Sequence, residues 1–407
     1  MHRPIRTDFS RMNTHDLAVE QLLHLPDKLI FDGSDFYGQQ PYSVMVRAGQ
    51  CVTAGECLIR HDAADLHAPS AAKVVSIEGT KLTLEPSAQD WQLSAKPPTE
   101  AEIYDDFPSF LGRIGLRGMG GSRFPASIKV KASMQADCFV LNAVECEPEV
   151  TIDQALLLHQ EDLVVAGIEA TVAAIGARRI VIAVRKGDKQ LLEALRARFK
   201  YEFLVMPDRY PTGAEKLIVK ALTGKMPPAG VLPFQFGVLV QNVASMRALG
   251  RAVSNGVPVI ERPLSVISPE QNVHRNLIVP IGMQIGAVLK AAGCLQGKGQ
   301  TIVAGGLMMG HEVSVDEVVD KGTTSVFLVS EAHVRGEARS CIRCGACNNG
   351  CPLGLHPIGM VERLANEQLG RPLRAQLAEC FLCGVCSSVC PSNIPLVEQL
   401  REGKKCL

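Results

Sequence analysis

The C-terminal part of the chain contains one cysteine pattern twice. Residues 341–352 read CIRCGACNNGCP and residues 380–391 read CFLCGVCSSVCP, so each copy is Cys-x2-Cys-x2-Cys-x3-Cys-Pro. Three thiolates in one short loop can surround an iron–sulfur cubane, whereas the fourth cysteine begins the next helix and cannot turn back. The repeat therefore predicts a ferredoxin-like module with two 4Fe–4S clusters that exchange their fourth ligands.

The exchanged arrangement assigns every cysteine of the repeat. One cluster is predicted to bind Cys341, Cys344, Cys347 and Cys390, and the other to bind Cys380, Cys383, Cys386 and Cys351. A pair of zinc sites is the alternative, but such sites usually combine two Cys-x2-Cys units across a longer gap. Because neighbouring clusters pass single electrons, the module predicts electron transfer, with an electron source elsewhere in the chain.

Length and composition describe an ordinary globular protein of several domains. The chain has 407 residues, and its 42 Lys and Arg residues balance 42 Asp and Glu residues. No net charge therefore attracts it to nucleic acid or anionic lipid. No apolar run approaches the roughly 20 residues of a membrane helix, and residues 1–4 lack the apolar core of a secretory signal. Eight of 14 cysteines lie in the repeat, which favours a reducing cytoplasm.

Residues 1–98 have the pattern of a small β domain. Val46, Gly49, Val52 and Gly55 recur at a regular spacing, and residues 67–70 read HAPS, which predicts paired strands with tight turns. The pattern resembles the lipoyl-type barrel-sandwich hybrid. A lipoyl carrier needs a lysine on its exposed hairpin, and residues 62–65 read DAAD. We therefore expect a structural or docking role.

The middle of the chain predicts an α/β domain followed by an α+β domain. After a linker at 96–99, apolar runs at 138–141, 180–184, 203–206 and 238–240 alternate with helical patterns at 191–199 and 214–222. Such alternation is typical of βαβ units around a parallel sheet. Residues 257–330 contain shorter strands at 264–267, 300–303 and 325–329 around one helix at 284–292.

Four segments of the predicted α/β domain contain candidate ligand-binding residues. Residues 115–125 read GLRGMGGSRFP, a glycine-rich loop before a helix, whose amides can hold an anion. Residues 142–148 read NAVECEP after a strand, residues 210–216 read YPTGAEK at a helix start, and Asn242 ends the last strand. Because ligands of α/β sheets bind where strands end, these segments are expected to converge.

The loop and the two later segments resemble the RnfC subunit of Rnf electron-transport complexes and, more distantly, the flavin subunit of respiratory complex I. The resemblance covers nearly the whole chain and implies four domains: an RnfC-type N-terminal barrel-sandwich domain (1–98), an FMN- and NADH-binding α/β domain (99–256), a β-grasp SLBB domain (257–330) and the two-cluster domain (331–407). It implies an NADH:acceptor oxidoreductase that transfers electrons through FMN. The chain would be peripheral, on the cytoplasmic side of the inner membrane, with membrane partners that couple the electrons to ion movement.

The resemblance also implies roles for individual residues. FMN would be lined by Gly118, Gly120, Gly121, Lys129, Asn142, Glu145, Tyr210, Gly213, Glu215 and Asn242. Among these, Lys129 would lie near the FMN phosphate. Phe124 would stack on the nicotinamide, and Glu147 would accept hydrogen bonds from NADH. A flavin suits this position because it exchanges both hydride and single electrons.

One departure from the family leaves alternatives open. Relatives usually read Gly-Gly-Ala-Gly-Phe-Pro, whereas this chain has Ser122 and Arg123 before Phe124. Three alternatives are open for Arg123: it binds a phosphate, it keeps the nicotinamide out of the cleft, or it is exposed to solvent. Two further functions remain: a soluble flavin and iron–sulfur reductase, such as a cobalamin reductase or the electron-transfer partner of an amino-acid reductase, and an electron relay with an inactive flavin site.

The remaining cysteines are expected to be buried or incidental thiols. They are Cys51, Cys57, Cys138, Cys146, Cys294 and Cys406. Cys146 lies between two glutamates, which should raise its pKa and make it a poor nucleophile. His67 and His356 have no ligand partner at a useful spacing along the sequence.

Overall fold

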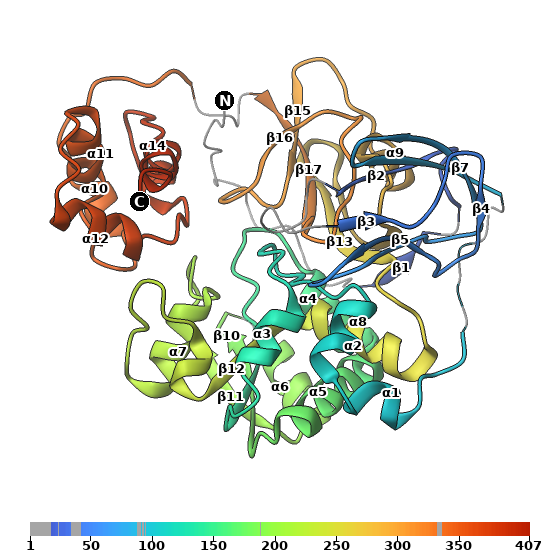
Figure 1. Cartoon of the computed structure of the whole chain (residues 1–407). Coiled ribbons are helices and arrows are strands. Elements are labelled where there is room, and N and C mark those ends of the chain that lie inside the picture. The colour runs from blue at the N-terminus through green and yellow to red at the C-terminus, as the bar shows by residue number, and fades with distance from the viewer. Residues whose placement is uncertain are drawn as a thin grey trace.

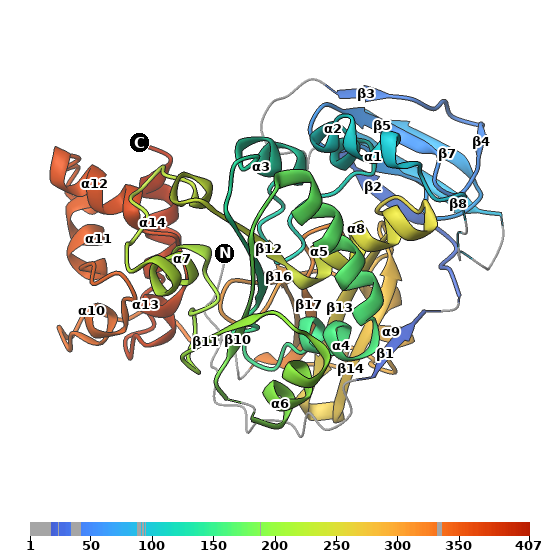
Figure 2. The same cartoon turned by 90° about the horizontal axis from the view of Figure 1, so that it is seen from below.

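The computed structural model describes residues 18–22, 24–33, 42–87, 91, 93, 95–187, 189–331 and 336–407. Residues 1–4, which bear on a secretory signal, lie outside this range. The described residues form a small β unit, an α/β unit, a six-stranded sheet and a C-terminal helical unit (Figures 1 and 2). The chain is thus a multidomain mixed α/β protein, as the sequence predicts.

The β unit consists of two small antiparallel sheets around an apolar core that includes the fully buried Leu29, Leu58 and Leu84. Its first sheet has the order β2 (Leu29–Asp32), β8 (Lys81–Pro86), β7 (Ala72–Glu78) and β4 (Cys51–Val52), and its second has the order β3 (Tyr42–Val44), β5 (Cys57–His61) and β6 (Leu66–His67).

The hairpin that joins β5 to β6 is buried at its tip. The amide of Asp65 donates a hydrogen bond to the Gly112 carbonyl (2.9 Å), and the Ser127 hydroxyl donates one to the Ala63 carbonyl (2.6 Å). Both partners belong to the α/β unit. The hairpin therefore docks one unit onto the other, in agreement with the role expected from its lack of a lysine.

The α/β unit is built on a parallel sheet with the order β11-β10-β9-β12. Phe139 and Leu141 of β9 pack with the helices of one face, while Val140 packs with Ile218 of α7 on the other. Because both faces are covered, the strands are continuous apolar runs. The strands are β9 (Cys138–Ala143), β10 (Arg179–Arg185), β11 (Glu202–Met206) and β12 (Val238–Asn242), and the helices are α1 (Glu100–Tyr104), α2 (Phe107–Arg113), α3 (Ala126–Ala132), α4 (Ile152–His159), α5 (Glu161–Ile175), α6 (Lys189–Arg198), α7 (Glu215–Thr223) and α8 (Val243–Asn255).

The strand order creates a switch point between β9 and β12. The chain proceeds from β9 to β10 and β11 on one side, and it later adds β12 on the other side of β9. The helices that follow β9 lie on one face of the sheet, whereas α7, which connects β11 to β12, lies on the other face. The direction of the connections therefore reverses at β9. In open α/β sheets this is the position at which ligands bind.

The six-stranded sheet contains the three strands predicted for the α+β domain and three that were not predicted, β1, β14 and β16. Its order is β1-β14-β13-β17-β15-β16, and β1 (Val19–Gln21) pairs in parallel with β14. These N-terminal residues, assigned by sequence to the β domain, thus belong to a different sheet. The other elements are β13 (Glu261–Ser268), β14 (Val273–Pro280), α9 (Ile285–Ala291), β15 (Gln300–Ala304), β16 (His311–Val313) and β17 (Ser325–Ser330).

The C-terminal unit is helical and has its own small core, which includes Met360, Leu377 and Leu400. Both views place it beside α7 (Figures 1 and 2). Within the described ranges, none of the helices combines the length and apolar character needed to cross a membrane. The helices are α10 (Ala346–Gly350), α11 (Pro357–Ala365), α12 (Arg371–Glu379), α13 (Val385–Ser388) and α14 (Leu396–Lys404).

Candidate functional site

Two asparagines mark the switch point of the α/β sheet. Asn142 of β9 and Asn242 of β12 lie opposite each other in the strand register. The Asn142 side-chain amide donates a hydrogen bond to the Gly213 carbonyl (2.9 Å). The Asn242 amide donates to the Asp153 carboxylate (2.5 Å), while its carbonyl oxygen caps α8 at the Ala244 amide. The structure therefore brings the strand-end segments and the 210–216 segment together.

The glycine-rich loop packs against the same edge of the sheet. The Met119 amide donates a hydrogen bond to the Ser245 hydroxyl in the first turn of α8 (2.9 Å). A Cβ at Gly120 would lie 3.3 Å from the Asn242 side chain, and a Cβ at Gly213 would lie 2.4 Å from the Val144 carbonyl. Because neither glycine has a side chain, the glycine-rich loop and the 210–216 segment can approach the strand ends closely.

A cation and a helix start meet beside this loop. Lys129 of α3 forms an ion pair with Glu215, the first residue of α7. Both side chains are only partly exposed. An ammonium at the amino-terminal end of a helix is a suitable place for a phosphate group. The Lys129 ammonium, the start of α7 and the close backbone approach at Gly120 and Gly213 thus fit FMN, the cofactor that the resemblance implies.

The glutamates of the 142–148 segment bind backbone amides. The buried Glu145 accepts from the amides of Asp153 (3.0 Å) and Gln154 (3.3 Å) at the start of α4. Burial, together with the negative charge of Asp153, raises the pKa of Glu145. Glu147 accepts from the amides of Met308 (3.1 Å) and Met309 (3.0 Å), which follow β15. Burial raises the pKa of Glu147 to about 7.

The thiol beside these glutamates, Cys146, has a raised pKa, as predicted. The pKa of Cys146 is raised to about 11. Burial is the main cause, and the negative charge of Glu147 adds to it. The sequence therefore predicted the direction correctly but attributed it to the smaller of the two effects.

The 210–216 segment also contacts the cysteine module. The Tyr210 hydroxyl donates a hydrogen bond to the Cys383 carbonyl (2.7 Å). Lys216 of α7 forms an ion pair with Glu379 at the end of α12 (3.0 Å), and Glu379 also accepts from the Ala229 amide (2.7 Å). The loop that begins the second cysteine copy is therefore fixed against the candidate flavin site.

The cysteines influence one another across the two copies. Besides burial, the charge of Cys351 raises the pKa of Cys380, Cys383 and Cys386. Burial and the charge of Cys390 raise the pKa of Cys347. Each fourth cysteine therefore lies near the other copy. Among the described residues, no three of these eight sulfurs lie within 4.8 Å of one another, a wider spread than a tetrahedral zinc site has.

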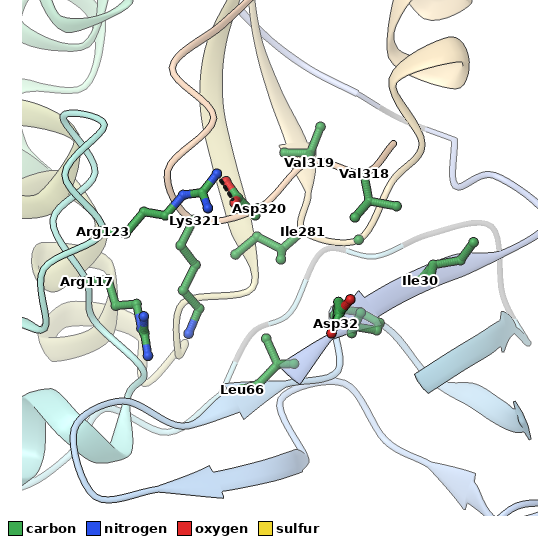
Figure 3. A pocket seen from close by; sticks show the side chains of 12 residues that line it. Ile30, Asp32, Leu66, Arg117, Arg123, Ile281, Val318, Val319, Asp320 and Lys321 are labelled. Carbon is green, nitrogen blue, oxygen red and sulfur yellow. Dashed lines mark ion pairs between the residues drawn. The ribbon is translucent and has the colours of Figure 1, made fainter. Parts of the chain in front are cut away.

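Arg123 has a partner within the chain. Its guanidinium lies 2.5 Å from the Asp320 carboxylate, and its backbone is left-handed with φ of 55° (Figure 3). The pair borders a cavity of about 60 Å³, which is also lined by Arg117, Lys321 and Leu66. The sequence did not predict this ion pair, because Asp320 lies almost two hundred positions further along the chain.

Three residues at this site were missed by sequence reasoning. Asp153 and Ser245 support the site through the hydrogen bonds described above. Arg262, which is fully buried in β13, donates hydrogen bonds to the carbonyls of Met119 in the glycine-rich loop and Thr323. An arginine inside an apolar strand was the available signal, since a buried charge needs polar partners.

Two family models match separate parts of the chain. The family model "Nuo51 FMN-binding domain" matches residues 111–251, and the model "4Fe-4S dicluster domain" matches residues 340–394. A solved structure of an NAD+-reducing [NiFe]-hydrogenase in the air-oxidized state is 21% identical with a TM-score of 0.46, over 75% of this chain and 65% of that one.

Two relatives extend the match over most of the chain. It is 29% identical over 375 residues to a subunit of the "Proton-translocating ferredoxin:NAD(+) oxidoreductase complex" of Clostridium ljungdahlii, covering 87% of this chain and 82% of the relative. It is 32% identical over 364 residues to a subunit of the "Ion-translocating oxidoreductase complex" of Rhodobacter capsulatus, covering 84% and 70% respectively. The chain, with its FMN-binding and 4Fe–4S dicluster domains, therefore belongs to the RnfC family of ion-translocating oxidoreductase complexes.

Proposed function

We propose that this chain is the NADH-oxidising subunit of its complex and passes the electrons through FMN and both clusters to membrane-embedded partners that move ions. The observation that carries this proposal is the hydrogen bond from Tyr210 to the Cys383 carbonyl, because it joins the candidate flavin site to a cluster loop. When bound, FMN supplies the conversion between a two-electron hydride and single electrons. The residues of the chain supply position and charge.

The proposed flavin site is supported by the convergence at the switch point. Asn142 and Asn242 fix the strand ends, and Gly120 and Gly213 allow close approach. Lys129 is the proposed phosphate ligand, because its ammonium lies at the start of α7. The ion pair with Glu215 already restricts the Lys129 side chain. Less side-chain entropy is therefore lost when a phosphate binds.

The proposed NADH site lies next to the flavin site. Phe124 and Glu147 are its proposed residues, for nicotinamide stacking and hydrogen bonding. Glu147 is bound to the amides of the loop at Met308, and a Cβ at Gly384 in the cluster loop would lie 2.4 Å from the Met308 carbonyl. One loop thus contacts both the proposed NADH residue and a cluster loop, which supports a short path between them.

The exposure of the cysteines supports an order for the two clusters. The cluster of Cys380, Cys383, Cys386 and Cys351 would receive electrons first, because Tyr210 contacts its loop. The other cluster would release them, because Cys341 and Cys344 are exposed whereas Cys383 is only partly so. An exposed cluster can approach an acceptor on another protein.

The names of the relatives support the finer assignments of position and partners. The Clostridium ljungdahlii protein is named as part of a proton-translocating complex. We infer that this chain binds other subunits of such a complex and is peripheral, on the cytoplasmic side of the inner membrane. We also assign the β unit within 1–98, apart from β1, and the unit at 257–330 to the barrel-sandwich and SLBB β-grasp folds, the former supported by its two small antiparallel sheets.

An anaerobic titration with NADH, followed by visible spectroscopy, tests the proposal. The purified chain should show a flavin band, and NADH should bleach both the flavin and the cluster absorbance. Bleaching by dithionite but not by excess NADH would contradict the proposed donor and favour a relay with an inactive flavin site. The ion pair between Arg123 and Asp320 argues against that relay, because it accounts for the residue that departs from the family pattern.

A further inference from the structure

A cluster of three potential metal ligands lies in the β unit, far from the cysteine repeat. The ligand atoms of Cys57, Asp65 and His67 all lie within 4.8 Å of one another, the single group of this kind among the described residues. Cys57 and His67 are paired across β5 and β6, so their side chains share one face of the hairpin. Their spacing along the sequence does not suggest a shared ligand set, and the strand register brings them together.

The imidazole of His67 is oriented as in a metal-binding histidine. The ring is buried, and its Nδ1 has no hydrogen-bond partner among the described residues. The backbone of Arg113 lies within hydrogen-bonding reach of the imidazole ring. Metal-binding histidines commonly donate one ring N–H to a carbonyl in this way, which leaves the other nitrogen with its lone pair available. A buried nitrogen without a partner otherwise destabilises the folded chain.

The distances and ligand types suit zinc. The Cys57 sulfur lies 3.7 Å from an Asp65 carboxylate oxygen. Tetrahedral zinc, with bonds of about 2.3 Å to sulfur and about 2.0 Å to oxygen, separates these ligands by about 3.5 Å. We propose that Cys57, Asp65 and His67 bind one zinc ion, with a fourth position open on the partly exposed side of Cys57. Thiolate, imidazole and carboxylate are the ligands that zinc uses in proteins.

The surrounding charges are compatible with a divalent cation. A Cys57 thiolate and the Asp65 carboxylate together cancel the charge of Zn²⁺, so the bound site is neutral overall. Lys321, in the turn before β17, faces the site, but its ammonium is held by the carbonyls of Asp65 (2.7 Å) and Gly115 (2.8 Å). Arg60 lies 3.8 Å from the Asp65 carboxylate, and its side chain is 61% exposed, so it can move away.

The position of the site indicates what zinc would do. The hairpin contacts the α/β unit at Gly112 and Ser127, and it contacts Lys321 in the turn that leads into β17 of the six-stranded sheet. It therefore lies where three units meet. A zinc ion that joins β5 to β6 would fix the hairpin that connects them, and it would be structural rather than part of the electron path.

Metal analysis of the full-length protein with intact clusters tests the proposal. The chain is purified anaerobically with about eight irons, incubated with one equivalent of zinc chloride and freed of unbound metal. Zinc and iron are then counted in the same sample, and the zinc environment is measured by X-ray absorption at the zinc edge. We expect about one zinc per chain with one sulfur at about 2.3 Å and the other ligands at about 2.0–2.1 Å.

Variants locate the zinc. Cys57→Ala and His67→Ala should reduce bound zinc to the level of a protein-free control, while iron stays at about eight. Cys51→Ala, which changes an exposed cysteine of β4 in the other sheet of the β unit, should keep the zinc. No zinc in the iron-complete wild type, zinc that persists in Cys57→Ala, or a spectrum with several sulfur ligands would overturn the proposal. If His67→Ala fails to fold, Cys57→Ala and the wild-type spectrum still decide.

Discussion

The hydroxyl of Tyr210 donates a hydrogen bond of 2.7 Å to the backbone carbonyl of Cys383, although the two residues are 173 positions apart. Burial raises the pKa of Tyr210, so the hydroxyl remains protonated and can donate at any physiological pH. This bond is a direct connection between the proposed flavin site and the cysteine module, and it is the first contact to test.

Tyr210→Phe should weaken the attachment of the cysteine module. Loss of the hydrogen bond leaves the Cys383 carbonyl without its donor, at a cost of about 1–3 kcal/mol. We expect slower reduction of the clusters by NADH in stopped-flow spectroscopy, with flavin and iron content unchanged. Tyr104→Phe is the control, because Tyr104 is exposed on α1. Equal reduction rates in both variants would show that the bond does not matter for transfer.

Lys129→Ala should lower FMN occupancy while iron content stays complete. Its ammonium is the proposed phosphate ligand, and one charge-assisted hydrogen bond contributes about 1.5–3 kcal/mol, or roughly 10- to 150-fold in affinity. Flavin released by denaturation is measured against protein. Lys131→Ala on the same helix is the control, since Lys131 is exposed. Normal flavin content in Lys129→Ala would remove this lysine from the site.

Substitutions of Arg123 should separate the contribution of its ion pair to stability from the contribution of its backbone conformation. Both Arg123→Gly and Arg123→Ala lose the bond to Asp320, which is worth about 0–1 kcal/mol for a partly exposed pair. Only the alanine keeps the cost of a left-handed backbone, about 1 kcal/mol. Thermal unfolding should therefore rank glycine above alanine. KM for NADH should stay unchanged in both variants. A large change in KM would indicate that Arg123 contacts the dinucleotide.

The pKa of Glu147 predicts a dependence of stability on pH. The folded chain keeps a proton on Glu147 up to about pH 7, whereas the unfolded chain releases it near the ordinary value of 4.5. Stability should therefore fall as pH rises between these values, by up to about 1.4 kcal/mol per pH unit for one proton. Glu147→Gln should flatten this part of the profile, and Glu149→Gln should not. Parallel profiles of unfolding temperature in wild type and Glu147→Gln would refute the assignment.

Pairs of cysteine substitutions should test the exchanged cluster ligands. Cys390→Ser alone should remove about half of the iron. Adding Cys341→Ser should remove no more, because both cysteines serve the same cluster. Adding Cys380→Ser instead should abolish the remaining iron. The reverse result, with Cys380 and Cys390 behaving as one set, would favour two clusters that each use a single sequence copy.

Much of this protein is determined by local sequence. The cysteine spacing predicts the dicluster module, because three thiolates of one loop reach one cubane. The apolar runs at 138–141 and 238–240 predict strands buried on both faces, and β9 and β12 confirm them. The convergence of Asn142, Gly213 and Asn242 follows from general topology, since parallel strands end at one edge of their sheet.

Tertiary structure alone decided the contacts between distant segments. Nothing in residues 19–21 indicates that they pair with β14, and nothing near Arg123 indicates Asp320. The pairing of Cys57 with His67 depends on the hairpin register, and a shift of one residue would turn one of them to the other face. Periodicity, caps and ligand spacing can be read from sequence, because these involve neighbouring residues. Which faces meet depends on the packing of the whole chain, and so only the fold could reveal the Cys57, Asp65 and His67 group.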